Sequence, residues 1–278
     1  MFGINKDNHD LLSLAVAAVA VLLSQFQPIY KYFDDYDLEP RSINYMQILP
    51  HPYNGITLNV PITFGNSGEV KGAIHDVYAF VTQKKSSDSF VYRASDIKLP
   101  KKGQMMFNEW YEFYPQSIEP DDIWSKTLRF SKVSFSDSWY SLINKTRVDI
   151  RADNEIWCED NYPACLEQNG LMYIPPKKFT TPVVDGVIQE HSWISEGSVK
   201  VVLLYIIGGV KPNEEVCQEY HAKIDEFDLS VLYEEVEFAV NGSASLSFDT
   251  IRPPVKTSFI RNCNSSTIKH AKAILSNL

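Results

Sequence analysis

The residues with the clearest potential for chemistry in this chain of 278 residues are two groups of carboxylates. The members of the two groups are Glu119, Asp121 and Asp122, and then Glu214, Glu215 and Glu219. A glycosidase needs two carboxyl groups that face each other across a sugar on a rigid scaffold. Nearness in sequence does not provide that facing geometry. We therefore predict solvated loops at both places and no catalytic residue.

Motifs for a nucleophile, a metal or a cofactor are absent from the sequence. It contains no G-x-S-x-G elbow and no H-E-x-x-H pair, and its six histidines show no ligand-like pairing. The four cysteines include no C-x-x-C pair, which argues against a structural zinc site. We expect no metal and no cofactor.

Cys158 and Cys165 flank the turn-rich stretch EDNYPA. In an oxidising compartment they would close a small disulfide loop, and free thiols beside a loop are the alternative. Four cysteines allow three pairings. The oxidation state therefore stays open.

The stretch LNVPITFGNSGEVKG, residues 58–72, has glycines around a short polar segment, as a phosphate-binding loop does. A Walker loop requires G-x-x-x-x-G-K-[ST] and a dinucleotide site requires G-x-G-x-x-G, and neither spacing occurs. Apolar residues alternate over 58–64, and a second β-like pattern follows over 73–81. We predict a hairpin whose turn is Gly65-Asn66-Ser67-Gly68. Pro61 has no donor for a ladder, which places the first strand at an edge or a bulge.

Composition points to a β-rich protein that does not bind nucleic acid. Aromatic residues make up 13% of the chain, and such side chains fit a pleated, half-buried surface. The formal net charge is −9, with 26 basic and 35 acidic residues and no dense basic stripe. Phosphate backbones require such a stripe, so a nucleic-acid partner is not expected.

Aromatic side chains near predicted loops are the best functional candidates. Large rigid aromatics are favoured at protein interfaces and also stack on sugar rings. Filling of inner sheet faces is the competing structural explanation. The candidate binding surface comprises Trp110, Tyr111, Tyr114, Trp124, Trp139, Tyr140 and Trp193.

The N-terminal region contains the most apolar run, LLSLAVAAVAVLL, at residues 11–23. A cleaved signal peptide and a buried core helix are two interpretations. We favour a third, an uncleaved anchor over residues 11–33 that inserts in the lipid bilayer, with Tyr30, Tyr32 and Phe33 at the interface and Lys31 snorkelling. The protein would then be a single-pass membrane protein, with its globular part on the cytoplasmic side.

Short strands separated by polar loops predict an antiparallel β-sandwich of one or two units. Further strands are expected over 89–92, 105–113, 127–135, 147–150, 179–188, 199–207, 229–240 and 245–251. The predicted organisation is a tail at 1–10, the anchor, an acidic linker at 34–42, a sandwich at 43–150, a second β-rich domain or second half of the same sandwich at 151–264, and a C-terminal amphipathic helix at 265–278.

The anchor stretch, together with residues 58–82, resembles bacterial membrane-anchored proteins that carry an immunoglobulin-like or late-embryogenesis-like sandwich. The resemblance covers residues 11–82. It implies location and fold and carries over no catalytic residue.

Two functions follow as expectations. The first is a non-enzymatic, membrane-anchored module that binds another protein through edge strands and loop aromatics. The alternative is an envelope carbohydrate-binding or glycoside-acting protein that uses the same aromatics. The oligomeric state is not indicated by the sequence.

Overall fold

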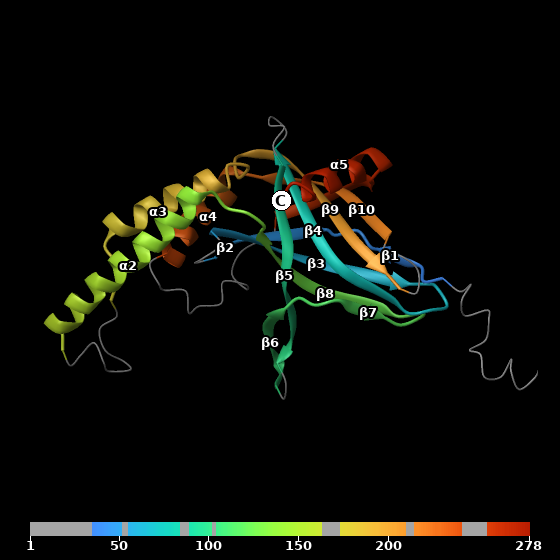
Figure 1. Ribbon diagram of the computed structural model, residues 1–278, viewed down its shortest axis with the longest axis horizontal. Coiled ribbons are helices and arrows are strands. Elements are labelled where there is room, and N and C mark those ends of the chain that lie inside the picture. Colours follow the sequence, from blue (N-terminus) through green and yellow to red (C-terminus); the bar gives the residue numbers. More distant parts are fainter. Residues whose placement is uncertain are drawn as a thin grey trace, which may run out of the picture.

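The computed structural model describes residues 35–51, 55–83, 89–101, 104–162, 173–209, 214–240 and 255–278 (Figure 1). Eleven strands form one sheet in this part of the chain. The strands are β1 (Leu38–Pro40), β2 (Tyr45–His51), β3 (Gly55–Asn66), β4 (Gly72–Gln83), β5 (Ser89–Lys101), β6 (Gln104–Glu112), β7 (Gln116–Ile118), β8 (Ile123–Lys132), β9 (Gly197–Gly208), β10 (Glu214–Ile224) and β11 (Val255–Asn262). The helices are α2 (Asp137–Asp160), α3 (Lys177–Glu190), α4 (Glu226–Val240) and α5 (Ser265–Leu275).

Eight of the strands close into an antiparallel barrel. Their order is β5-β8-β3-β2-β11-β10-β9-β4, and β4 pairs again with β5 to complete the circle. The mainly β character is therefore confirmed, but the predicted immunoglobulin-like sandwich is wrong. Alternating strands fill a barrel interior as readily as the space between two sheets, so the pattern alone did not separate the two architectures.

The predicted hairpin over residues 58–81 is also wrong. The two strands exist as β3 and β4, but β3 lies between β8 and β2, while β4 pairs with β9, β5 and β7. The connection is held by Asn66, whose side chain is 2% exposed. Its Oδ1 accepts from the backbone of Asp37 and Gly68, and its Nδ2 donates to the carbonyls of Val70 and Ile118. This loop is a structural corner.

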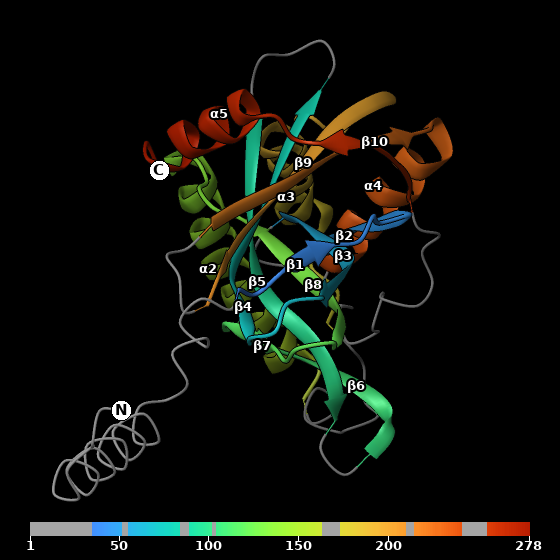
Figure 2. The same ribbon diagram turned by 90° about the vertical axis from the view of Figure 1, so that its right-hand side faces the viewer.

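The barrel interior is filled by apolar and aromatic side chains. β3 contributes Ile56, Leu58, Val60, Ile62 and Phe64, each at most 1% exposed. β9 faces two ways, because Val201 and Leu203 belong to the interior cluster while Val202 and Leu204 pack beneath α5 on the outer wall (Figure 2). Burial on both faces explains the run over residues 199–207, which is apolar except for Lys200.

Three helices form a layer on the left of Figure 1, away from α5. α2 packs on α3, α3 packs on α4 and β3, and α4 packs on β2. The predicted strands over 147–150, 179–188 and 229–240 are wrong, because these segments lie in α2, α3 and α4. Short apolar runs are ambiguous between strand and helix, and packing on the barrel decided for helix.

α5 is attached to the barrel by a covalent link. Cys217 of β10 and Cys263, just before α5, form a disulfide across a sequence separation of 46. Cys158 is disulfide-bonded as well. Asn264 caps the helix by accepting from the Thr267 backbone at 2.9 Å. The helix therefore stays on the outer wall.

The predicted membrane anchor, residues 11–33, and the expected strand at 245–251 lie outside the described residues. Within the described ranges, no helix combines the length and the apolar character needed to cross a bilayer. We therefore correct the prediction of a single-pass membrane protein with a transmembrane helix, which the structure does not support.

Candidate functional site

Three of the seven predicted surface aromatics are buried. Trp124, Trp139 and Trp193 are 9%, 3% and 0% exposed. Trp139 of α2 packs against Gly186 of α3, where an added Cβ would lie 3.2 Å from the indole. Trp193 packs against Tyr92 of β5. These residues fill the core, as the competing structural explanation held.

The other four aromatics divide between two places. Trp110 and Tyr111 belong to β6, and Tyr114 follows it. Tyr111 is 37% and Tyr114 is 57% exposed, while Trp110 is half-buried. Tyr140, 53% exposed, lies on α2 and does not join them. Trp110, Tyr111 and Tyr114 are called the hairpin aromatics below.

The hairpin of β5 and β6 projects from the barrel (Figure 1). The register of β5 on β8 shifts between Ala94 and Asp96, which marks a bulge at Ser95. Bulges bend a strand and redirect its path. The carbonyl of Ser95 accepts from the Phe113 backbone at 2.8 Å, and β6 pairs with the outer half of β5 from Asp96 onward. The bulge therefore steers the hairpin away from the wall.

Two cations hold the indole of Trp110. The guanidinium carbon of Arg129 lies 3.9 Å from the ring centroid, and Nζ of Lys98 lies 5.5 Å from it. Cation–π contacts of this kind contribute about 0.5–2 kcal/mol. The indole of Trp110 is consequently held in place on the hairpin.

A polar cleft of about 500 Å³ lies at the end of β6, where Glu112 and Phe113 line it. It lies where β6 gives way to Phe113 and Pro115, over β5 and β8. Arg93, Ser95 and Ser131 line it. Arg93 is paired with Asp76 at 2.7 Å, and the hydroxyls of Ser95 and Ser131 are 2.9 Å apart. The cleft offers donors and acceptors on a rigid strand surface.

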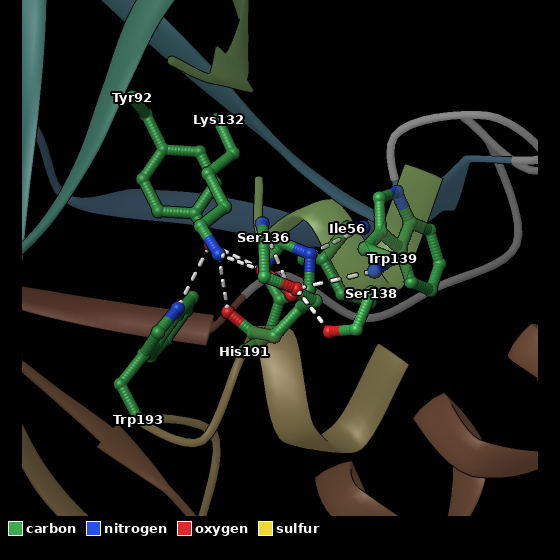
Figure 3. Close-up of polar contacts among 9 residues, drawn as sticks. Ile56, Tyr92, Lys132, Ser136, Ser138, Trp139, His191 and Trp193 are labelled. Atoms are coloured by element: carbon green, nitrogen blue, oxygen red, sulfur yellow. Dashed lines mark hydrogen bonds and ion pairs between the residues drawn. The ribbon is translucent and has the colours of Figure 1, made fainter. Parts of the chain in front are cut away.

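A buried polar cluster joins the helix layer to the barrel (Figure 3). The Tyr92 oxygen lies 2.6 Å from His191 Nδ1, and Trp193 Nε1 donates to it at 2.8 Å. The Ile56 backbone donates to His191 Nε2 at 3.3 Å. Because Nε2 accepts, the neutral imidazole carries its proton on Nδ1 and donates to Tyr92. Burial raises the pKa of the Tyr92 phenol, which therefore stays protonated.

Beside this cluster, Lys132 and Glu190 form an ion pair at 2.6 Å, with both side chains 11% exposed. Ser136, the N-cap of α2, also hydrogen-bonds Glu190. Burial raises the pKa of Glu190, but the hydrogen bonds from Lys132 and Ser136 outweigh burial and hold the pKa below its usual value. The pair fastens the ends of α2 and α3 to β8.

The cluster has no room for a substrate. The cavity beside His191 and Ile56 has a volume of about 10 Å³, which is at the lower limit for a single water. A Tyr–His pair next to a Lys–Glu pair has the residue types of an acid–base site, but it is sealed. We assign it to the attachment of the helix layer.

Of the two carboxylate groups, Glu119, Asp121 and Asp122 lie in an exposed loop as predicted, and the other group does not. Glu119 is exposed and pairs with Lys71 at 2.6 Å. Glu219 is only 2% exposed and lies within β10, where it pairs with Lys200 and Arg261 and accepts from Thr267. The prediction of a solvated loop at Glu214, Glu215 and Glu219 is wrong because β10 runs through these residues. Sequence reasoning named Glu219 but did not predict its burial, and it did not single out His191, because a single charged or polar residue carries no signal of its partners.

Comparisons with known proteins provide no relative. No family model and no curated protein matches the sequence. A crystal structure of a protein from Archaeoglobus fulgidus aligns with 69% of this chain and 97% of its own, at 6% identity and a TM-score of 0.26. A likeness at this level supports no conclusion about the fold or the function of this chain. The closed barrel shows that the resemblance to anchored sandwich proteins is wrong.

Proposed function

We propose that this protein is a non-enzymatic binding protein that contacts a second protein through the hairpin aromatics. The observation that carries the proposal is the projection of the β5–β6 hairpin from a closed barrel (Figure 1). Tyr111 in β6 and Tyr114 just after it are exposed. The barrel interior supports the same conclusion, because packed side chains occupy it.

The geometry suits a protein contact for two reasons. Tyrosine supplies a large apolar area at low conformational cost and keeps a polar tip for hydrogen bonds. The stacked Arg129 and Trp110 already hold this surface in place, so little ordering is required on binding. Each of the eight barrel strands pairs with a neighbour on both sides, and we assign the contact to the projecting hairpin instead of to the barrel wall.

Site-specific photo-cross-linking tests the proposal. A photoreactive phenylalanine replaces Tyr111 or Tyr114 in the full chain expressed in its native cells, and Tyr140 serves as the matched control because it is as exposed as Tyr114. We expect one protein to be captured from the first two positions and not from the third. Tyr114→Ala should weaken binding of the purified partner about 10-fold. Capture of the same set from all three positions, or none from any, refutes the proposal.

A carbohydrate ligand is the second candidate, and the polar cleft favours it. Arg93, Ser95 and Ser131 line the cleft together with the ring of Phe113, and sugars are bound by such polar groups beside an aromatic ring. A glycan array separates the two candidates. Binding of a defined glycan that is lost in Trp110→Ala and Tyr114→Ala but kept in Tyr140→Ala favours the sugar, while a blank array with a captured protein favours the first proposal.

A further inference from the structure

A pocket of about 310 Å³ lies between α5 and the outer wall of the barrel. Its volume is at the lower end of the range of small-molecule sites. The wall side is built by β4 and β9, which pair at Phe80↔Val202 and Thr82↔Lys200. Side chains two residues apart on a strand point to the same face. These four side chains therefore form one continuous surface beneath the helix, and all four line the pocket.

The wall surface is apolar at one end and polar at the other. Phe80 and Val202 are 4% and 6% exposed and belong to the apolar cluster beneath α5. The next pair along the strands is polar. Lys200 keeps 38% of its side chain exposed, and the hydroxyl of Thr82, opposite it, lies 3.0 Å from that of Ser89. A ligand on this surface would contact both an apolar end and a polar end.

The helix side of the pocket has the same division. Thr267, Ala271 and Ile274 line the pocket and recur at the spacing of one helix face. Ala271 and Ile274 pack with the apolar cluster, while Thr267 lies in the first turn of α5. Nζ of Lys200 and Oγ1 of Thr267 lie 3.1 Å and 3.0 Å from the same oxygen, Oε1 of Glu219. The polar ends of the helix side and the wall side therefore coincide.

The polar end carries more positive than negative charge. The single carboxylate of Glu219 is paired with two cations, Lys200 and Arg261. His270 also lines the pocket, and the described lining residues include no acid. Residues 84–88, which precede β5 and lie outside the described ranges, have the sequence KKSSD, in which basic residues also outnumber acidic ones. The excess of positive charge favours an anionic group at this end.

We propose that this pocket, the α5 pocket, binds a small monocarboxylate with an apolar body. The carboxylate accepts from Nζ of Lys200 and from the imidazole of His270. The apolar body lies on Phe80, Val202 and Ile274. The pocket belongs to α5, β4 and β9, at the top of Figure 1, whereas the β5–β6 hairpin projects at the bottom. Binding there does not depend on the hairpin aromatics.

Titration of the full chain with sodium hexanoate tests this site. 1-Hexanol is the neutral analogue with the same alkyl chain, n-hexylammonium chloride reverses the charge, and sodium chloride matches the ionic strength. Methyl NMR of Val202 and Ile274 locates the binding, and the exposed Val148 of α2 provides the control methyl groups. We expect saturable shifts at Val202 and Ile274 with a dissociation constant on the order of 1 mM. 1-Hexanol should bind about 5-fold more weakly, because it lacks the charge.

Variants make the test specific. Lys200→Gln and His270→Gln should each weaken hexanoate binding about 3-fold, because a partly exposed charge and a single hydrogen bond each contribute modestly. His270 is exposed, so His270→Gln keeps the test valid if Lys200→Gln does not fold. Lys269→Gln is the matched control, because it removes a cation from the adjacent, exposed position of α5, which is not among the described lining residues. It should leave binding unchanged.

Four results would overturn the proposal. They are the absence of a saturable shift at Val202 and Ile274, binding of 1-hexanol or n-hexylammonium as tight as that of hexanoate, unchanged binding in both Lys200→Gln and His270→Gln, and a loss in Lys269→Gln as large as that in His270→Gln. Each of these results is distinct from the cross-linking result at the hairpin.

Discussion

Removal of one buried hydroxyl, in Tyr92→Phe, should destabilise the whole fold. Phenylalanine keeps the ring and leaves no large cavity, so the change isolates the oxygen. That oxygen accepts from Trp193 Nε1 and from His191 Nδ1, and the three side chains are at most 1% exposed. Two buried donors would lose their acceptor at about 1–3 kcal/mol each. We expect the free energy of unfolding to fall by about 3 kcal/mol and Tm by roughly 6–12 °C.

Urea unfolding followed by tryptophan fluorescence, together with calorimetry, measures this loss. Tyr140→Phe is the matched control, because that hydroxyl is on an exposed ring, and it should change the unfolding free energy by less than about 0.5 kcal/mol. Trp193→Phe in both backgrounds completes a double-mutant cycle, in which the two changes should be non-additive. A Tyr92→Phe protein within about 0.5 kcal/mol of the parent would refute the assignment of the cluster as the attachment of the helix layer.

Three further predictions concern strain, cross-linking and pH. Gly55→Ala should destabilise the protein by about 1–3 kcal/mol in urea unfolding, because Gly55 has φ +64° and a Cβ there would lie 2.9 Å from His191 Nε2; an unchanged midpoint would contradict this. The double variant Cys217→Ala/Cys263→Ala should lose about 2–4 kcal/mol, as expected for a disulfide that closes a loop of about 46 residues, and a Tm equal to that of the parent would exclude it. For Glu219, burial raises the pKa but hydrogen bonds from its paired cations outweigh burial and lower it. Its contribution to stability is then present above the unfolded pKa of about 4.5 and is lost as pH falls through the lower folded pKa. Glu219→Gln should therefore flatten the acid limb of stability against pH, and parallel curves would contradict the argument.

Local patterns in the sequence predicted where strands occur, but they did not predict which strands pair with each other. The alternation over residues 58–64 and the apolar run over 199–207 both correspond to strands, because side-chain direction repeats every two residues within one segment. Strand pairing, in contrast, depends on residues that are far apart in the sequence. β4 pairs with β9 from Ala73↔Gly208 to Gln83↔Val199, a separation of more than 100 residues with no local signal. The sandwich and the hairpin were both errors about pairing.

The helix layer shows the same division. Residues 179–188 contain β-branched and apolar side chains that suit a strand, yet α3 forms there because Val183 and Val187 pack on one face against the barrel and α4. A short apolar run does not indicate which other element of the fold will pack on it.

The amino-acid sequence by itself determined that the chain is mainly β and rich in aromatic residues, since composition and periodicity are properties of each segment. Tertiary structure alone decided that eight strands close into a barrel, that three tryptophans are core while Tyr111 and Tyr114 are exposed, and that Glu219 is buried. These outcomes depend on contacts between distant segments, and the free energy of such contacts exists only once the segments have come together.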